Sequence, residues 1–366
     1  MTKKIKKAAF FFLFASFSLP ALSSAAIGTS IEYVKAKVLK AHNHVPVGKQ
    51  GIQDLTVKVM GGGHKNQQLD VKNIYWREEG YNTRLNSNDL VVLRIAGINR
   101  EPIEAQIMGH YRSRYIYLSG GVFLLLFLAV FGWKKIRILF SVAVNLFLFS
   151  IILFPLIKIG FQPLPLAVLI GSAAVIITII IILGFSRKFV SAACGGIAGM
   201  IMAGILSLIF LDMMHLSGLF SRDSRMLLTA SRHMADWNIW DLKGLIAAGI
   251  IVTCMGAVID VAVTIASSCY QVSSERKRVT AQLLWQSGMR IGKDIIATML
   301  NSLVLAFLGI SLPLIAVFDV MGIPFLRIIN FEVFSIIIAS ALISSISFIV
   351  TVPATAFISC RLFRKI

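Results

Sequence analysis

Acidic residues are scarce in this chain, which carries 17 Asp and Glu against 36 Lys and Arg and has a formal charge of +19. Charged residues of both signs make up only 14% of the sequence, whereas a soluble domain is about a quarter charged. The mean hydropathy is +0.81. This shortage of charge excludes an ordinary soluble protein and indicates a polytopic membrane protein. The positive charges stand mostly at the ends of apolar runs, which favours the charge bias of cytoplasmic loops over nucleic acid binding.

Motifs that would mark an enzyme are missing. The chain has no GxxxxGK[ST] phosphate-binding loop, so an ATP-driven pump on this polypeptide is not expected. The GxSxG nucleophile motif and the HExxH zinc motif are absent too. The acids and histidines of residues 212–243 match no ligand spacing, and arginines of the same segment can pair with the acids. We therefore predict no enzyme, no cofactor, no metal site and no nucleic acid partner.

Cysteine is rare, and residues 27–115 contain none. The four cysteines all lie in or at the ends of apolar runs: Cys194, Cys254, Cys269 and Cys360. In such places a thiol usually serves as a small packing side chain. No disulfide is therefore expected, and residues 27–115 must fold around a core of their own.

The first 26 residues have the layout of a secretory signal peptide. Four lysines precede an apolar stretch from Ala8 to about Leu19, and small residues follow it. Ser23 and Ala25 fit the small-x-small rule for cleavage after Ala25. An uncleaved anchor with the same orientation is the alternative. Both interpretations place the following segment outside the cytoplasm.

Residues 27–115 are predicted to form a small exported β domain. Apolar and polar residues roughly alternate over five stretches that Gly, Asn and Pro separate; these stretches are 31–41, 52–61, 68–76, 89–97 and 103–111. Five short strands suit a small barrel or sandwich of the OB or SH3 type. The histidines of this segment lack the spacing of metal ligands and are expected on the surface; they are His42, His44, His64 and His110.

Residues 116–366 are predicted to form an all-α polytopic membrane bundle of about seven transmembrane helices. Seven apolar runs are long enough to span a bilayer; they are 116–132, 138–157, 164–184, 189–211, 244–268, 294–315 and 334–358. If the β domain lies outside, the loops predicted inside carry most of the Lys and Arg between and after the spans. This bias places the C-terminus in the cytoplasm. We expect the protein in the cell inner membrane.

Small residues recur on the fourth and fifth apolar runs. Gly195 and Gly199 are four residues apart on one helix face, which Ala203 continues, and Gly256 is a further small position on the fifth run. Small residues at this spacing let another helix approach closely. We expect these glycines to pack helices within the bundle, and an interface between two copies of the chain is the alternative.

Two predicted spans each carry a polar stripe that includes a carboxylate. The stripe on the fifth run consists of Thr253, Gly256, Asp260, Thr264, Ser267 and Ser268, and that on the sixth of Asp294, Thr298, Asn301 and Ser302. Steps of three and four residues put each set on one helix face. Polar groups in a bilayer need partners, so both stripes are expected to face the bundle interior or a water-filled cavity.

Asp260 is predicted to lie deeper in the bilayer than Asp294. Asn301 is predicted at a depth near that of Asp260, which gives a candidate cluster of Asp260, Thr264 and Asn301, with Asp294 and Thr298 beside it. A charge at the bilayer centre costs roughly 2.5 kcal/mol or more, so Asp260 is expected to be protonated, ion-bound or hydrogen-bonded. An ion site and a structural hydrogen-bond clamp both meet that requirement.

The segment between the two stripes is basic and mildly amphipathic. Its apolar side chains suit the inner membrane surface, with Trp285 at headgroup level; they are Val279, Leu283 and Leu284. A plain solvated loop is the alternative. Gly288 and Gly292 are expected to break this piece from the sixth span.

The sequence around the stripes resembles the YibE/F-like membrane protein family. The resemblance is carried by GAVIDVAVTIASSCYQ followed by LWQSGMRIGKDIIATMLNSLVLAFLG, and it extends through the WKKIRIL turn and the Gly-rich fourth span. The positions that match the family's motif are Gly256, Asp260, Ser267, Gly288, Gly292, Asp294, Thr298 and Asn301. Thr264 stands where a serine is common, and Lys293 where an arginine is common. The resemblance implies the topology but names no substrate.

Two functions fit these observations. One is a transporter or permease for a small solute, coupled to a proton or cation at Asp260. The other is a non-transporting anchor or scaffold whose exported domain binds a protein partner. The polar stripes favour transport, because a plain anchor does not need them. The sequence shows no inverted repeat of the kind found in many transporters, which counts against transport. The lipid bilayer surrounds the bundle in both cases, and both are compatible with a homo-oligomer.

Overall fold

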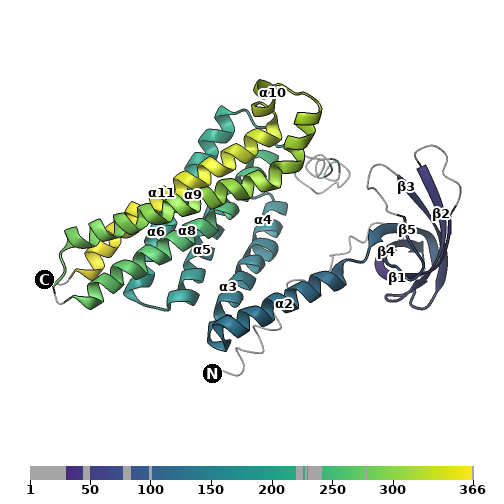
Figure 1. Ribbon diagram of the computed structural model, residues 1–366, viewed down its shortest axis with the longest axis horizontal. Coiled ribbons are helices and arrows are strands. Elements are labelled where there is room, and N and C mark those ends of the chain that lie inside the picture. The colour runs from purple at the N-terminus through teal and green to yellow at the C-terminus, as the bar shows by residue number, and fades with distance from the viewer. Residues whose placement is uncertain are drawn as a thin grey trace. The chain divides into compact units, whose positions relative to one another are not determined.

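The computed structural model describes residues 30–43, 50–76, 84–98, 101–219, 226, 229, 241–276 and 278–364. By its internal contacts the chain divides into two units, residues 18–134 and residues 135–366 together with 1–17. The first unit holds five strands and helix α2, and the second holds the remaining helices (Figure 1). The predicted signal peptide lies outside the described residues.

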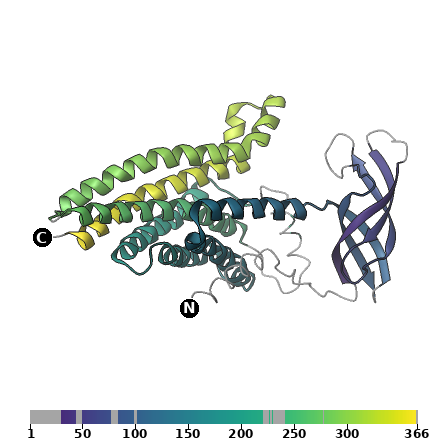
Figure 2. The same cartoon turned by 60° about the horizontal axis from the view of Figure 1, so that its bottom comes forward.

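A single antiparallel sheet forms the β domain. Its strands are β1 (Ser30–Asn43), β2 (Gln50–Val59), β3 (Gln68–Trp76), β4 (Leu90–Ile98) and β5 (Glu101–His110). Their order is β3-β2-β1-β4-β5, which puts the long β1 at the centre. The edge strands β3 and β5 approach each other, so the sheet curls into a half-barrel (Figure 2). The five predicted strands are confirmed, and they form one curled sheet and not a sandwich.

Alternation along the strands builds the core of this half-barrel. Successive side chains of a strand point to opposite faces, and the inward set is apolar. The outward set includes several lysines, so the domain is amphipathic strand by strand. The buried apolar residues of this core are Val34, Ala36, Val38, Leu55, Val57, Val59, Val71, Leu85, Val91, Leu93, Ile95 and Ile107.

One polar side chain, Gln53, is fully buried in the β domain. Its amide nitrogen donates to Asn43 Oδ1 at 2.6 Å and to the carbonyl of Leu85 at 2.9 Å. Its amide oxygen accepts from the backbone N–H of Leu85 at 3.0 Å and from Asn73 Nδ2 at 2.9 Å. All hydrogen-bonding positions of this amide are therefore used, and the segment before β4 is tied to the sheet.

In the described part of the chain, seven helices are long and apolar enough to cross a membrane, as predicted. They are α2 (Ser113–Phe131), a composite helix over Ile136–Lys158, α5 (Pro163–Leu183), α6 (Arg187–Met213), α8 (Leu242–Glu275), α9 (Ala281–Val320) and α11 (Glu332–Phe363). Short helices η1 (Trp133–Lys135) and α10 (Phe325–Ile329) stand between them. The chain is thus a helical membrane protein preceded by a β domain.

The composite helix consists of α3 (Ile136–Phe147), the π-helical turn η2 (Leu148–Leu153) and α4 (Phe154–Lys158). Pro155 lacks an amide hydrogen for the carbonyl of Ile151, and the wider π turn stands directly before α4. Asn145 of α3 is joined to Thr178 of α5 by hydrogen bonds of 3.0 and 3.2 Å. These bonds fix the composite helix against the bundle.

Helix α8 is central to the second unit, where it packs against α5, α6, α9 and α11. Its buried side is made of small and β-branched residues that admit close neighbours, including Ile251, Val258, Val261, Ala262 and Ile265. Figure 2 shows α8, α9 and α11 running side by side. The sequence therefore builds a tightly packed group of helices around α8.

Glycines of α6 face α11. A Cβ atom at Gly195 would overlap the hydroxyl of Thr355, and one at Gly199 would overlap the hydroxyl of Thr351. The two backbones approach so closely only because both positions lack a side chain. These glycines thus lie in a helix contact within the chain. Gly256 differs, because it is exposed and a Cβ atom there would meet nothing within 4 Å.

Helix α9 is continuous from Ala281 to Val320, so the predicted break at Gly288 and Gly292 is wrong. A Cβ atom at Gly288 would come within 2.9 Å of the Ala356 side chain, and one at Gly292 would overlap Val352. Both glycines therefore serve the close approach of α9 to α11. The gain from this packing outweighs the weak helix propensity of glycine.

Candidate intramembrane site

Asp260 lies near the middle of α8. It is 15 residues before the last residue of the helix, Glu275, and 18 after the first, Leu242, which at 1.5 Å per residue is about 22 and 27 Å. The predicted span of 244–268 ends before the helix does, so Asp260 is farther from the helix end than that span implied. Asp260 therefore lies several turns from either end of α8.

The polar stripe of α8 lies on the open side of the helix. Thr253, Gly256, Asp260 and Thr264 are exposed, whereas Val258 and Val261 on the opposite side are fully buried. The stripe was expected to face the bundle interior or a water-filled cavity, and the described helices leave it outside the packed interior. The small and β-branched residues of α8 pack against α5, α6 and α11, so the polar residues take the opposite side of the helix.

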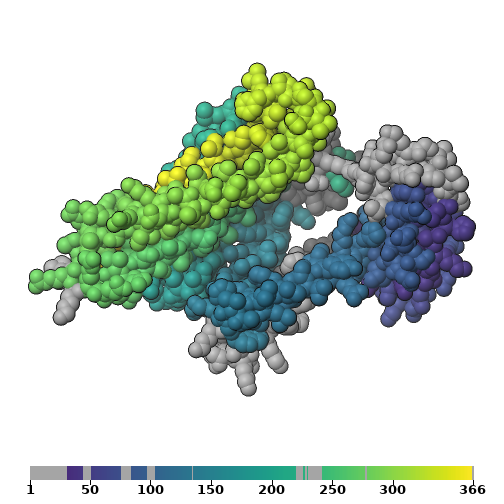
Figure 3. Space-filling model, in the orientation of Figure 1, coloured from purple at the N-terminus to yellow at the C-terminus, as the bar shows by residue number. Residues whose placement is uncertain are grey.

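The stripe of α9 is open as well. Asp294, Thr298 and Asn301 are exposed, and the buried side of α9 is the glycine side that meets α11. Beyond Gly292 few residues of α9 are buried, and the helix forms a ridge along the face of the bundle (Figure 3). Both sequence-predicted stripes thus lie on the bundle surface.

The relative heights of the stripes follow from one contact. A Cβ atom at Gly288 would lie 3.0 Å from Cys269 Sγ, which sets α9 antiparallel to α8 at this level. Nine residues before Cys269 on α8 is Asp260, and nine residues after Gly288 on α9 is Ala297. Asp260 is therefore level with Ala297, next to Thr298. Asn301 lies one further turn along, about 6 Å away in height. Thr298 and not Asn301 is therefore the stripe residue nearest in height to Asp260.

The threonine hydroxyls of the stripes bond within their own helices. Thr264 Oγ1 donates to the carbonyl of Asp260 at 2.7 Å, and Thr298 Oγ1 donates to that of Ile295 at 3.0 Å. Within the described residues, no hydrogen bond or ion pair joins the carboxylate of Asp260 to another side chain. In the described part of the chain, the stripe residues of α8 and α9 thus lie at similar heights, and no hydrogen bond links the two stripes.

Sequence reasoning missed a third polar stripe, on α11. Its hydroxyl residues recur at steps of three and four and are buried; they are Ser340, Ser344, Ser347, Thr351, Thr355 and Ser359. Most donate to the carbonyl four residues earlier, as Thr355 does to Thr351 at 2.8 Å. The same periodicity that marked α8 could have found this stripe. Its residues carry no charge, so the sequence does not mark them as costly in a bilayer.

The α11 stripe also bonds to α6. The hydroxyl oxygens of Ser191 and Ser359 lie 2.6 Å apart, and Ser191 Oγ donates to the carbonyl of Thr355 at 3.1 Å. Two buried hydroxyls, those of Ser207 on α6 and Ser344 on α11, have no hydrogen-bond partner in the described part of the chain. Unpartnered polar atoms are unusual in a packed interior.

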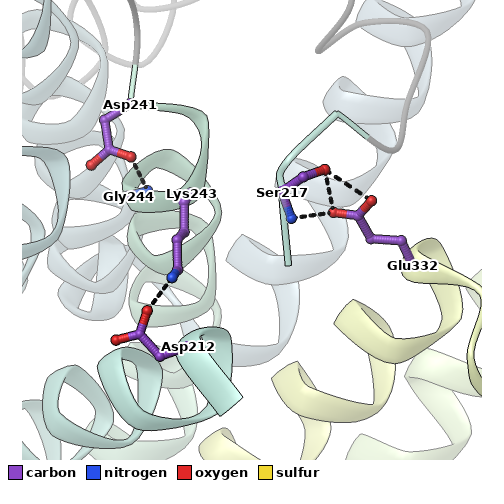
Figure 4. Close-up of polar contacts among 6 residues, drawn as sticks. All are labelled: Asp212, Ser217, Asp241, Lys243, Gly244 and Glu332. Atoms are coloured by element: carbon purple, nitrogen blue, oxygen red, sulfur yellow. Dashed lines mark hydrogen bonds and ion pairs between the residues drawn. The ribbon is translucent and has the colours of Figure 1, made fainter. Parts of the chain in front are cut away.

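Charged side chains gather where α6 ends and α8 and α11 begin (Figure 4). Lys243 forms an ion pair with Asp212, and Asp241 caps α8 by accepting from the N–H of Gly244 at 2.8 Å. Glu332, at the start of α11, accepts from the N–H of Ser217 at 2.6 Å and from its hydroxyl at 2.9 Å. These contacts hold the helix ends together.

Among the described residues, the histidines of the β domain belong to no group of three or more metal-ligating side chains. His64 is buried, with Nδ1 3.1 Å from Gln67 Oε1, and so differs from the expected surface residue; its neighbour in the turn supplies the partner. His42 is exposed, and His44 lies outside the described residues. Among the described residues no group of three or more His, Cys, Asp or Glu could hold a metal ion.

The seven apolar helices, with the curled sheet before them, define a multi-pass membrane protein with a separate β domain. Residues 119–365 match the family model described as YibE/F-like protein, and residues 29–110 match the YibE/F family N-terminal domain. The chain therefore belongs to the YibE/F-like family. No curated protein and no solved structure matches it.

Proposed function

We propose that this protein is a transporter or permease-like protein of the cell inner membrane, with Asp260 as its intramembrane binding group. The observation that carries the proposal is the position of this carboxylate. It lies near the middle of a membrane helix, on an open face, with no hydrogen bond to another side chain of the described chain. An acid in such a place is costly and is typical of ion or proton pathways.

The surroundings of Asp260 support an exchangeable site more than a clamp. A clamp needs a hydrogen bond from the carboxylate to a neighbouring helix, whereas the nearby threonines donate to backbone carbonyls of their own helices. The polar faces of α8 and α9 also give a solute several weak contacts along the membrane. In this role Asp260 binds a proton, a cation or a small polar solute, and Thr264, Asp294, Thr298 and Asn301 line its surroundings.

The proposal includes an orientation. The β domain lies outside the cytoplasm after export by the N-terminal segment, and seven crossings bring the C-terminus to the cytoplasmic side. The basic residues after α8, including Arg276 and Arg278, then lie inside, in agreement with the positive-inside rule. Fusions of reporter enzymes after residue 110 and at the C-terminus test this, and activity of both on one side would contradict it.

The role of Asp260 is tested by complementation of a deletion strain. Asp260→Asn keeps the size of the side chain and removes its titratable charge, so the variant should reach the membrane at normal levels and fail to complement. Asp319→Asn is the control and should complement, because Asp319 is exposed at the end of α9 and lies outside the proposed site. An abundant Asp260→Asn protein that complements fully would refute the ion-site proposal.

A second function, an anchor whose exported domain binds a protein partner, is favoured by the outer face of the sheet. Ile52 and Ile74 are register partners on β2 and β3 and are both exposed, as are Ile31 and Tyr33 on β1. Exposed apolar residues of this kind are common at interfaces. If the anchor function is correct, Ile74→Asp abolishes complementation whereas Asp260→Asn does not.

A further inference from the structure

A cavity of about 420 Å³ opens between the start of α5, the end of α6 and the start of α8. Its size falls within the range of roughly 300–1,000 Å³ that is usual for small-molecule sites. Five apolar residues line it: Leu164, Pro165, Leu208, Leu211 and Ala247. The polar lining comes from Gln162, Ser207, Asp212, Asp241 and Lys243. An apolar cavity with a few convergent polar groups is the usual form of a ligand site.

Ser207 is the inner polar group of this cavity. It is fully buried, and its hydroxyl has no hydrogen-bond partner in the described part of the chain. Several other buried serines of the membrane helices bond to the carbonyl four residues earlier, as Ser340 does to Ile336 at 2.7 Å and Ser347 to Ile343 at 2.6 Å. Ser207 does not, although the same carbonyl geometry is available on any helix. A hydroxyl left unbonded in a cavity wall is suited to a bound molecule.

The charged groups stand at the ends of the helices that frame the cavity. Lys243 pairs with Asp212, and Asp241 bonds to the N–H of Gly244 (Figure 4). The side chains of Lys243 and Asp212 are 38% and 72% exposed, so this pair meets water. Among the described residues, two carboxylates against one ammonium leave the lining negative. A ligand with a positive charge is therefore favoured over an anion.

We propose that this cavity binds a small organic amine that carries a hydroxyl at its other end. Its ammonium group lies by Asp212 and Asp241, its hydrocarbon part lies against the leucines, and its hydroxyl bonds to Ser207. On α6, Ser207 and Asp212 are five residues apart, about 7.5 Å of helix rise, which suits a chain of about five carbons. The site is separate from Asp260, 13 residues beyond Ala247 on α8.

Binding is tested on the purified full-length protein in detergent micelles, with 5-amino-1-pentanol as the probe and calorimetric titration as the readout. Pentylamine lacks the hydroxyl and 1,5-pentanediol lacks the charge. The amino alcohol should bind tighter than either compound. Ser207→Ala should weaken binding of the amino alcohol by about threefold to tenfold, since it removes one hydrogen bond. The affinity for pentylamine should stay unchanged. Ser340→Ala is the matched control and should change neither.

Lys243→Gln gives a second test, in which tighter binding is expected. A misfolded variant would bind more weakly, so misfolding cannot produce this result. Removing this ammonium group frees Asp212 from its ion pair, so both amines should bind the variant more tightly than the wild type. Equal binding of the diol and the amino alcohol would overturn the proposal. So would amine binding that neither Ser207→Ala nor Lys243→Gln changes, or the absence of amino alcohol binding to the wild type.

Discussion

The hydroxyl of Thr264 donates to the backbone carbonyl of Asp260 at 2.7 Å, and not to its carboxylate. This bond stays within α8 and leaves the acid to other partners. Thr264→Val should therefore have little effect on the apparent unfolding temperature of the purified protein. The expected change in the free energy of unfolding is about 0.5 kcal/mol or less. Complementation by this variant should stay intact. A loss of function as severe as that of Asp260→Asn would show that the hydroxyl serves the acid after all.

Gly195 and Gly256 make a matched pair of small residues in different surroundings. Alanine at Gly195 would overlap Thr355, whereas alanine at Gly256 would meet nothing within 4 Å. We expect Gly195→Ala to destabilise the protein by about 1–3 kcal/mol through overpacking. Gly256→Ala should be neutral or stabilise by up to about 1 kcal/mol through helix propensity. Thermal unfolding in detergent compares the two, and equal losses would contradict the assigned packing.

Substitution of the buried Gln53 should strongly destabilise the β domain. Gln53→Leu leaves the N–H and the carbonyl of Leu85 without their side-chain partner, and each unmet bond costs about 1–3 kcal/mol. Gln106→Leu is the control, because Gln106 is exposed on β5. Limited proteolysis of the full-length protein should cleave the Gln53 variant within the β domain much faster than the control. Similar cleavage rates would argue against the buried network.

Glu332 joins the start of α11 to the segment that follows α6. Its carboxylate accepts hydrogen bonds from the backbone N–H groups of Ser217 and Gly218 at 2.6 and 2.9 Å. Glu332→Ala should lower the unfolding temperature, since hydrogen bonds to a charged group contribute about 1.5–3 kcal/mol. Asp319→Ala at the exposed end of α9 should have little effect. A Glu332 variant as stable as the Asp319 variant would be the contrary result.

Elements could be predicted from the sequence because their signals are local. Apolar runs of sufficient length gave the seven helices, and alternation with turn residues gave the five strands. The break at Gly288 and Gly292 was predicted from propensity alone. It failed because tertiary packing against Ala356 and Val352 decides the conformation there.

The candidate site was less predictable. A helical period shows which residues share a face, so Asp260 and Thr264 were grouped correctly on one side of α8. It does not show which side faces the neighbouring helices, and that depends on long-range packing. The height of Asn301 relative to Asp260 depends in the same way on the contact of Gly288 with Cys269. The unbonded hydroxyl of Ser207 has no sequence signature, because a serine in an apolar helix usually bonds to its own backbone.

The accessibility of the Asp260 carboxyl group is the most direct test of the central claim. Dicyclohexylcarbodiimide enters bilayers and modifies protonated carboxyl groups there, and peptide mass spectrometry identifies the modified residue. Native membranes that contain the full-length protein should yield modified Asp260, with no modification at this position in Asp260→Asn, and the modified wild type should lose activity in the cell. Unmodified Asp260 in membranes where Asp294 reacts would show a closed contact and contradict an exchangeable intramembrane site.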